Sequence, residues 1–363
     1  MDAKNRKQLF DNIKTDMKNA NYVYNPLFSI VAATYLTRNW AGDPLWLISV
    51  APPGAGKSCT LNQFWALTDV ETVSSITPAG LITCFDLHGE DPSLFAKLDG
   101  KLLLAKDFGS IMTLRYDDMK DIFMMFREAF DGHVEKKFAH ILRSYDLRFN
   151  FIAASTEAAD QHRTLNQQLG ERFLRFQAPV SQVQWPSPEV NDGLKNNVKD
   201  WMDELERSND IPKSIDVQWI AEEAETTARL RTELVHFGTT SEILDIPRFE
   251  HPTRLCKQFD KLYKGLIAIT GDEEFARKTT QEAARNCISK RRINVLKLLN
   301  KKPGLNGSEI CRELYLGRRV IRELLGDLVA IGVLIKEHPK DFPNEYKYVV
   351  SPEYTARCNN FIF

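Results

Sequence analysis

The chain has 363 residues, of which 43% are hydrophobic and 27% charged, and its formal net charge is −1. This length allows two or three domains, and no apolar run approaches the roughly 18 residues that a membrane-spanning helix needs. The polar N-terminus lacks the apolar core of a signal peptide, and the six cysteines include no Cys-x-x-Cys pair. We therefore expect a soluble, cytoplasmic protein with reduced thiols, without a membrane partner, a zinc site or a disulfide framework.

The first strong local signal follows an N-terminal helical extension that we expect over residues 1–40. Residues 45–50 form a continuous apolar run, typical of a strand buried on both faces, and residues 59–67 have a helical pattern. The segment between the two predicted elements is rich in glycine and proline and ends in Lys-Ser. It runs Val50-Ala51-Pro52-Pro53-Gly54-Ala55-Gly56-Lys57-Ser58. This strand, loop and helix order predicts a phosphate-binding loop.

Such a loop turns its backbone N–H groups toward a phosphate at the positive end of the following helix. Lys57 would reach the β- and γ-phosphate oxygens, and Ser58 would ligate Mg²⁺. The full pattern has Gly where this chain has Ala51, but that position needs only a small residue. We therefore predict ATP and Mg²⁺ as cofactors. The predicted nucleotide-binding residues are Pro53, Gly54, Ala55, Gly56, Lys57, Ser58 and Cys59.

Further strands and helices alternate after the loop, which predicts a mostly parallel sheet flanked by helices. The strand-like runs lie at 71–76, 80–84, 101–105 and 149–154. The fold class expected from this pattern is α/β.

ATP hydrolysis also needs a carboxylate near Mg²⁺, a polar sensor of the γ-phosphate and a cation for the developing charge. Asp107 follows an apolar strand and is the candidate carboxylate, a second predicted ligand of Mg²⁺. Ser155 and Thr156 end a second apolar strand and suit a sensor, and Arg172 near a helix end could reach a neighbouring subunit.

The second half of the chain changes character. The span 181–211, rich in Pro, Asn, Asp and Ser, is expected to lead out of the nucleotide-binding domain, and residues 214–290 are almost wholly helical in pattern. Three short helices and two strands are then predicted, at 292–300, 308–314, 318–331, 333–336 and 346–350. This layout is typical of a winged helix-turn-helix, which places a helix in the major groove of DNA.

Basic residues gather in this last part. Residues 290–350 carry 13 Lys and Arg against 7 Asp and Glu, a net charge of +6, so the rest of the chain carries −7. At the start of the 318–331 helix, Val320, Leu324 and Leu325 would face the core. The predicted DNA contacts there are Arg318, Arg319 and Arg322. The alternative is a winged helix that packs only against protein.

The motifs together resemble a known family. Their order is that of AAA+ ATPases of the minichromosome maintenance helicase branch, and it covers about residues 40–350. The motifs are Gly54-x-Gly56-Lys57-Ser58, Lys106-Asp107-Phe108, Arg127-Glu128-Ala129, Ala153-Ala154-Ser155-Thr156, Arg172-Phe173 and Pro252-Thr253-Arg254-Leu255. The lead-in Gly42-Asp43-Pro44-Leu45-Trp46-Leu47 is similar to that of related phage and mobile-element helicases.

The resemblance implies an AAA+ core at 41–212, a helical lid at 213–290, and a winged helix with a tail at 291–363. It implies Thr156 or Ser155 as first sensor and Arg254 as second sensor. It also implies Arg172 as an arginine finger acting in trans, on the nucleotide bound by a neighbouring subunit. A finger acting in trans implies a homo-oligomeric ring, which we expect to be a hexamer. A hairpin before the first sensor contacts single-stranded DNA in this branch, which implies DNA contact by Lys136 and Lys137 of the 131–137 insert.

Two departures from the family pattern stand out. The family strand ends in Asp-Glu, whereas this chain has Lys106-Asp107, so Asp107 is either the base or the metal ligand. Loss of a positioned base costs on the order of 10²–10⁴ in rate. Only about 40 residues precede the predicted core, so we expect a replication partner protein to supply any further domain function.

Three functions remain open at this stage. The first is an ATP-driven ring motor, an MCM-like DNA helicase that replicates a phage or mobile element. The second is an AAA+ replication initiator or helicase loader. The third is an ATP-gated signalling or defence switch whose winged helix binds protein.

Overall fold

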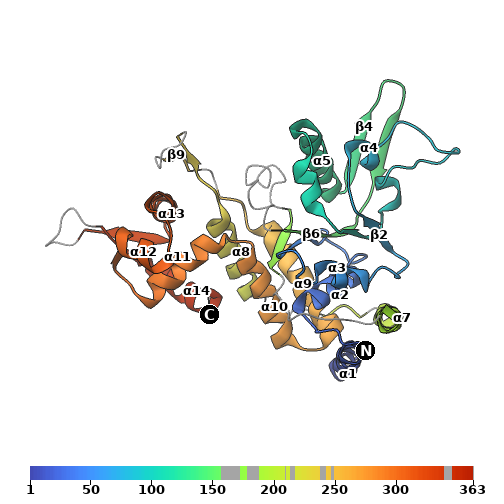
Figure 1. The fold of residues 1–363 in the computed structure, drawn as a ribbon, viewed down its shortest axis with the longest axis horizontal. Coiled ribbons are helices and arrows are strands. Elements are labelled where there is room, and N and C mark those ends of the chain that lie inside the picture. The colour runs from blue at the N-terminus through green and yellow to red at the C-terminus, as the bar shows by residue number, and fades with distance from the viewer. Residues whose placement is uncertain are drawn as a thin grey trace. The chain divides into compact units, whose positions relative to one another are not determined.

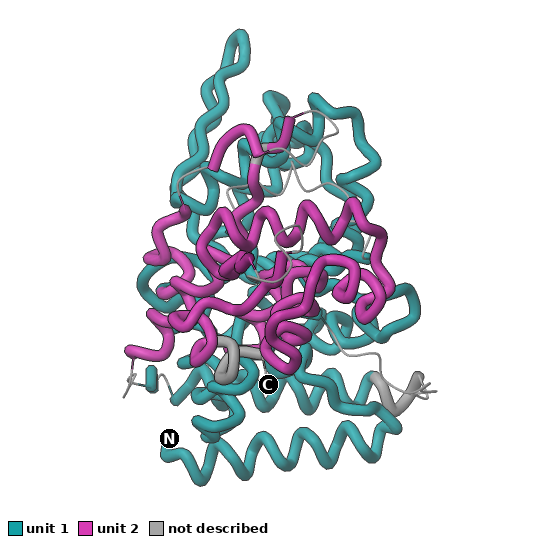
Figure 2. Tube along the Cα trace, turned by 90° about the vertical axis from the view of Figure 1, so that its left-hand side faces the viewer, with its two compact units in different colours: residues 1–215, 257–280 teal, residues 216–256, 281–363 magenta. Residues whose placement is uncertain are grey.

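The computed structural model describes residues 1–156, 172–177, 188–208, 210–212, 217–237, 243–246, 249–338 and 346–362 (Figure 1). The chain forms two compact units, which Figure 2 distinguishes by colour. Unit 1 comprises residues 1–215 and 257–280, and unit 2 comprises residues 216–256 and 281–363. The region predicted as a lid, 213–290, is thus divided between the two units. Among the described helices, none is both long and apolar enough to cross a membrane.

Unit 1 is built on a parallel sheet of five strands, as the alternating pattern predicts. Its spatial order is β2-β3-β6-β1-β7, and every neighbouring pair is parallel. The strands are β1 (Trp46–Val50), β2 (Val70–Val73), β3 (Leu102–Ala105), β6 (Asn150–Ser155) and β7 (Leu174–Gln177). The central strands β1, β3 and β6 are buried along their whole length, which explains why their sequences are mostly apolar. The α/β class is therefore confirmed, and the sheet is compatible with a P-loop-like fold.

Helices flank this sheet. Of the described helices, those wholly within unit 1 are α1 (Ala3–Asn19), α2 (Pro26–Leu36), α3 (Lys57–Asn62), α4 (Pro78–Leu81), α5 (Tyr116–Phe130) and α7 (Pro188–Ser208). Two 3₁₀ turns join them, η1 (Phe95–Lys97) and η2 (Phe108–Thr113). Helices α9 (Thr253–Thr270) and α10 (Glu273–Asn286) each have residues in both units.

An aromatic cluster centred on Trp46 joins the sheet to helix α5. The Trp46 indole lies between 5.1 and 5.8 Å from the ring centroids of Phe126, Phe130, Phe149, Phe151 and Phe173. Its Nε1 donates to the Phe149 carbonyl at 2.8 Å, so the polar end of the buried indole is satisfied. The cluster fixes β1, and therefore the start of the loop after it, against α5.

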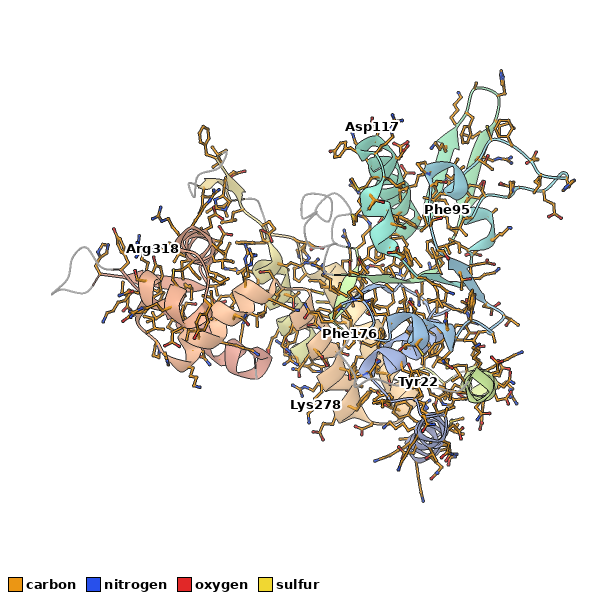
Figure 3. All side chains as sticks on the ribbon, viewed as in Figure 1. Tyr22, Phe95, Asp117, Phe176, Lys278 and Arg318 are labelled. Carbon is orange, nitrogen blue, oxygen red and sulfur yellow. The ribbon has the colours of Figure 1, made fainter. Side chains whose placement is uncertain are left out.

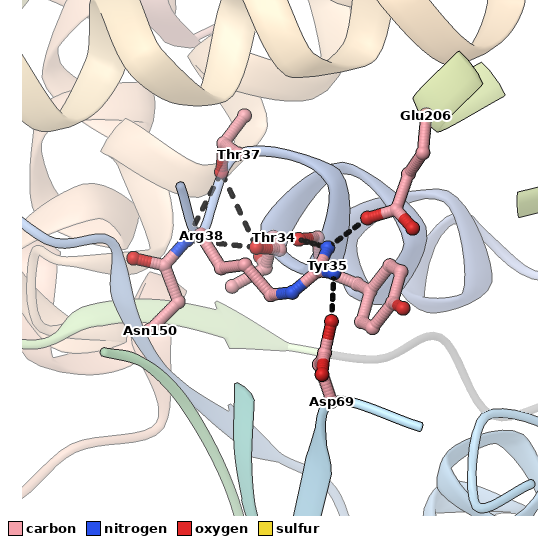
Figure 4. A network of polar contacts seen from close by, with 7 residues as sticks. All are labelled: Thr34, Tyr35, Thr37, Arg38, Asp69, Asn150 and Glu206. Atoms are coloured by element: carbon pink, nitrogen blue, oxygen red, sulfur yellow. Dashed lines mark hydrogen bonds and ion pairs between the residues drawn. The ribbon is translucent and has the colours of Figure 1, made fainter. Parts of the chain in front are cut away.

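Polar contacts lie at the same end of this strand, where Leu45 leads into Trp46 (Figure 4). The Asn150 side chain donates to the Thr34 carbonyl at 2.7 Å and accepts from the backbone N–H of Leu45 at 2.8 Å. Nearby, the buried Arg38 guanidinium donates to Asp69 at 2.5 Å and also pairs with Glu206 of α7. These contacts tie α2, α7 and the leads into β1 and β2 together.

One expectation for unit 1 is wrong. The segment predicted as a strand at 80–84 begins instead with helix α4, because Thr77 caps it by accepting from the Gly80 N–H and Pro78 occupies its first turn. The span 181–211 lies near the end of the first stretch of unit 1, which ends at residue 215. Helix α7 lies in that span and packs against α1 and α2, because apolar residues recur on one of its faces.

A β-hairpin precedes β6. Its strands are β4 (His133–Lys137) and β5 (Leu142–Asp146), paired antiparallel, with Lys136 opposite Arg143 and Lys137 opposite Leu142. The hairpin extends away from the sheet in both views of the chain (Figures 1 and 2). A hairpin is therefore present where the family resemblance implied one.

Unit 2 contains a small antiparallel sheet of order β10-β12-β11 with helices packed beside it. Its elements include α11 (Lys290–Lys301), β10 (Leu305–Asn306), α12 (Gly307–Leu314), α13 (Arg318–Ala330), β11 (Leu334–Glu337), β12 (Lys347–Val350) and α14 (Pro352–Ile362). It also holds α8 (Gln218–Arg231), β8 (Val235–His236) and β9 (Ile243–Asp245). The helices and strands predicted over 292–350 thus lie where the sequence placed them, to within two residues at each end.

A buried arginine organises this unit. Arg292 of α11 donates to the carbonyls of Leu230 and Thr232 and to the Asp327 carboxylate of α13, at 2.8, 2.6 and 2.9 Å. Ile321, Leu324 and Leu325 make the buried face of α13, whereas Val320, predicted for that face, is half-buried. The exposed face of α13 is therefore set by its packing on the rest of unit 2.

Candidate functional site

The loop after β1 adopts a conformation that depends on its glycines. Gly54 and Gly56 both have φ of 79°, in the left-handed region that favours glycine. Gly56 is also the residue from which helix α3 begins, at Lys57. Ala55 between the glycines is buried, whereas Pro53 and Ser58 are exposed and Cys59 is half-buried, where burial raises the pKa of its thiol. Loops of this kind direct backbone N–H groups toward a common point, which suits an anion.

Lys57 lies over this loop. Its Nζ donates to the carbonyl oxygens of Ala51 at 2.5 Å and Pro52 at 3.0 Å. Partial burial lowers the pKa of Lys57, and the negative charge of Asp107 opposes that shift. The ammonium group therefore lies where a phosphate held by the loop would meet it, within the electrostatic reach of Asp107.

Asp107 and Ser155 lie side by side at the carboxyl ends of two neighbouring strands. A Cβ atom built on Gly109 would lie 3.1 Å from Asp107 Oδ1 and 3.6 Å from Ser155 Oγ, so Gly109 lies against both groups. The carboxylate is exposed, and the hydroxyl belongs to β6, which pairs directly with β1. Ser155 donates to the carbonyl of Thr156, which is half-buried. These strand ends and the loop form one edge of the sheet, the usual place for ligands in α/β folds.

Lys106, which stands beside Asp107 in the sequence, turns away from this edge. Its Nζ lies 3.0 Å from the centroid of the Trp65 ring, and the Trp65 Nε1 donates to Thr72 at 2.6 Å. Burial lowers the pKa of Lys106. The strand end therefore presents one carboxylate to the loop, and the adjacent lysine is engaged elsewhere.

Sequence reasoning missed a contact between the N-terminal segment and the loop helix. The hydroxyl groups of Tyr22 and Thr60 lie 2.5 Å apart in a buried position, and burial raises the pKa of Tyr22 (Figure 3). Tyr22 thereby joins residues outside the motif to helix α3. No local pattern marks this pair, because its members are 38 residues apart.

Arg172 is placed inside its own chain. Its guanidinium is buried, donates to Asp131 at 2.8 Å and lies 5.5 Å from the Phe130 ring centroid. Its carbonyl accepts from the Gln258 side chain at 2.7 Å. In this arrangement the side chain is not presented to a second subunit, so a role in trans stays a prediction that requires Arg172 to leave Asp131.

Arg254, the predicted second sensor, belongs to unit 2, where its guanidinium lies 3.6 Å from Glu250. The second-sensor role of Arg254 stays a prediction.

The two hairpin lysines face in opposite directions, because side chains alternate along a strand. Lys137 is exposed, as is Leu142 opposite it. Lys136 is half-buried on the face that includes Val134, and its Nζ lies 5.8 Å from the Phe138 ring centroid. A nucleic-acid backbone that runs along one face of the hairpin would therefore contact Lys137 or Lys136, but not both.

In unit 2, the three predicted arginines lie on the exposed side of α13. Arg319 pairs with Glu323 one turn later at 3.0 Å, and Arg318 lies at the start of the helix (Figure 3). The structure thus brings these arginines together on one short helix, at its N-terminal end.

The donor set at the loop fits Mg²⁺. This cation retains several waters and uses one or two protein oxygens together with phosphate oxygens, so Ser58 and Asp107 would suffice. In the described parts of the chain, no group of three or more His, Cys, Asp or Glu could hold a metal by itself.

The sequence matches no protein-family model, and no curated protein matches it. The class established by the structure is an α/β fold with a five-stranded parallel sheet flanked by helices, compatible with a P-loop-like fold.

Proposed function

We propose that this chain is an ATPase of the AAA+ class and acts as an MCM-like DNA motor. The observation that carries the proposal is the arrangement at one edge of the sheet. There, a loop with two left-handed glycines and Lys57 faces Asp107 and Ser155 at neighbouring strand ends. Phosphate transfer to water is catalysed almost entirely by positioning and charge stabilisation, which is what this set of groups offers.

ATP bound with Mg²⁺ would supply the γ-phosphoryl group and a cation that neutralises its charge, with Ser58 and Asp107 holding the metal. The chain's own residues do the positioning. The Lys57 ammonium would exchange its two carbonyl acceptors for phosphate oxygens. Ser155, with Thr156 beside it, would donate to the phosphate from the next strand. Asp107, the one carboxylate among the described residues of this edge, would orient water or the metal.

Two features support action on DNA. The β4–β5 hairpin presents the exposed Lys137 away from the sheet, and the elements of residues 290–350 fit a winged helix with a net charge of +6. A cationic surface binds the phosphate backbone with a strong dependence on salt. A homo-oligomeric ring, in which the DNA strand passes between hairpins, follows from the family resemblance.

A second candidate, an ATP-gated switch, is favoured by one specific observation. Among the described residues at the loop's edge, Asp107 is the one carboxylate, and Arg172 is held by Asp131 of the same chain. Both features suit slow hydrolysis, which a switch tolerates and a motor does not. A helicase loader or replication initiator is the third candidate and shares the same nucleotide site.

The three candidates differ in their response to DNA. Steady-state ATP hydrolysis should be measured without DNA, with single-stranded DNA and with duplex DNA, using Lys57→Ala as the control. The motor predicts stimulation by single strands that falls with salt. Hydrolysis indifferent to DNA would contradict the motor and favour the switch, and stimulation by one particular duplex sequence would favour the initiator.

A further inference from the structure

The most exposed large apolar side chain of the described residues lies in unit 2, at the turn between α12 and α13. Tyr315 is 94% exposed and ends helix α12 in the left-handed region, with φ of 54° and ψ of 38°. Helices commonly end at such a residue, but it is usually glycine, because a side chain there is strained. The chain keeps a tyrosine in a strained position where its ring gains almost no burial, so folding does not explain its presence.

The surface beside Tyr315 is a shallow groove of about 390 Å³, lined by Leu305, Glu309, Arg312, Glu313 and Tyr315. The two carboxylates are already engaged. Glu309 accepts from the backbone N–H of Asn306 in a capping box at 2.8 Å, and Glu313 accepts from Lys302 at 2.7 Å.

A cationic helix face begins directly after this turn. Arg318 and Arg322 are exposed on α13 and form no ion pair with any described residue, whereas Arg319 is paired with Glu323. The aromatic ring and the arginines are thus neighbours in sequence and belong to one turn and the helix that follows it. Their charge complements a polyanion, and a tyrosine adds a ring for sugar contact and a hydroxyl that donates to phosphate.

We propose that Tyr315 and the exposed arginines of α13 form one contact surface for the backbone of duplex DNA. The hydroxyl of Tyr315 donates to a phosphate oxygen, and Arg318 and Arg322 neutralise neighbouring phosphates. This proposal rests on the proposed DNA-binding function of unit 2, but it does not depend on ATP hydrolysis.

Three variants of the full chain distinguish the effect of backbone strain at Tyr315 from the effect of its side-chain contact with DNA. Tyr315→Gly removes the side chain and the strain, Tyr315→Phe removes only the hydroxyl, and His88→Gly is a matched control. His88 is an exposed non-glycine residue with φ of 53°, in unit 1 and outside the proposed surface. Affinity for a duplex of mixed sequence is measured over a range of salt concentrations, together with the melting temperature of each variant.

Tyr315→Gly is expected to keep or raise the melting temperature while weakening duplex binding about tenfold or more, the scale of a hydrogen bond to a charged group. Tyr315→Phe should show most of this loss of duplex affinity, and His88→Gly should show none of it. The slope of log affinity against log salt should stay unchanged in Tyr315→Gly, because the side chain is neutral. In Arg318→Ala the slope should fall by about one.

Several results would overturn the proposal. If the unmodified chain does not bind duplex DNA, both this proposal and the proposed DNA function of unit 2 fail. If it binds but Tyr315→Gly binds equally well, or only single-stranded binding is weakened, this proposal fails alone. Should Tyr315→Gly not fold, Tyr315→Asn replaces it, because asparagine tolerates the left-handed region and cannot place a ring on the sugar.

Discussion

At the scale of single residues, the opposite orientations of Lys106 and Asp107 determine what the candidate site contains. The sequence predicts a carboxylate after the strand at 102–105, but not the direction of its neighbour. That direction depends on Trp65, a residue from another segment, over whose ring the Lys106 ammonium lies. The loop itself is predictable from sequence, since its glycines are needed for local backbone geometry, whereas the side-chain orientation depends on tertiary contacts.

Asp107→Asn should therefore separate nucleotide binding from hydrolysis. We expect ATP to bind almost as tightly as to the unmodified chain, because Lys57 and the loop remain, while hydrolysis falls on the order of 10²–10⁴. Fluorescent-nucleotide titration and single-turnover hydrolysis measure the two steps. Lys106→Ala is the matched control and should leave nucleotide binding intact. A larger loss of hydrolysis in Lys106→Ala than in Asp107→Asn would contradict the proposed role of Asp107 in hydrolysis.

The pair between Arg172 and Asp131 gives a second prediction at this scale. The pair joins residues 41 positions apart, and no sequence pattern indicates it. If Arg172 acts in trans, Asp131→Asn should weaken its attachment and raise ATP hydrolysis of the oligomer several-fold. Adding Arg172→Ala should remove that gain. A rise that persists without Arg172, or no rise in a confirmed oligomer, would exclude the finger role.

At the scale of elements, periodicity and capping signals predict most of what is observed, and errors arise where local and tertiary signals differ. The strands β1, β3 and β6 are buried throughout and mostly apolar, and they were predictable. The strand expected at 80–84 is wrong because a capping threonine and a proline favour helix α4. Helix α7 was missed because polar residues dominate its composition, although its apolar residues recur at helical spacing.

The hairpin gives the prediction at the element scale. Because Lys137 is exposed and Lys136 shares the face of buried Val134, the two lysines should contribute unequally to DNA contact. We expect Lys137→Ala to reduce single-strand-stimulated ATP hydrolysis and the salt dependence of binding, and Lys136→Ala to have a smaller effect. Measurement of both variants in parallel serves as its own control. Equal losses of stimulated hydrolysis in the two variants would contradict the unequal roles of the two lysines. No loss in either variant would contradict contact between the hairpin and DNA.

At the scale of the whole molecule, charge is distributed unevenly along the chain. Residues 290–350 carry +6, although the net charge is −1, so a separate polyanion-binding function for unit 2 is consistent with the sequence. The boundaries of the two units were less predictable, because unit 1 is made of two stretches of chain and helices α9 and α10 have residues in both units.

Assembly is the prediction at this scale. A nucleotide site completed by a neighbour predicts that ATP promotes a closed ring, which we expect to be a hexamer. Sedimentation of Asp107→Asn, which should hold ATP without hydrolysing it, should show the ring with ATP and smaller species without it. A chain that stays monomeric with saturating ATP would contradict both the ring and the trans role of Arg172.

The central claim is that the loop at residues 50–58 binds the phosphates of ATP. Calorimetric titration of the chain with ATP and Mg²⁺, beside Lys57→Ala, tests this claim most directly. We expect one ATP site per chain, with an affinity that falls strongly in Lys57→Ala and when Mg²⁺ is omitted. Binding of equal affinity in Lys57→Ala, or no binding by the unmodified chain, would contradict it.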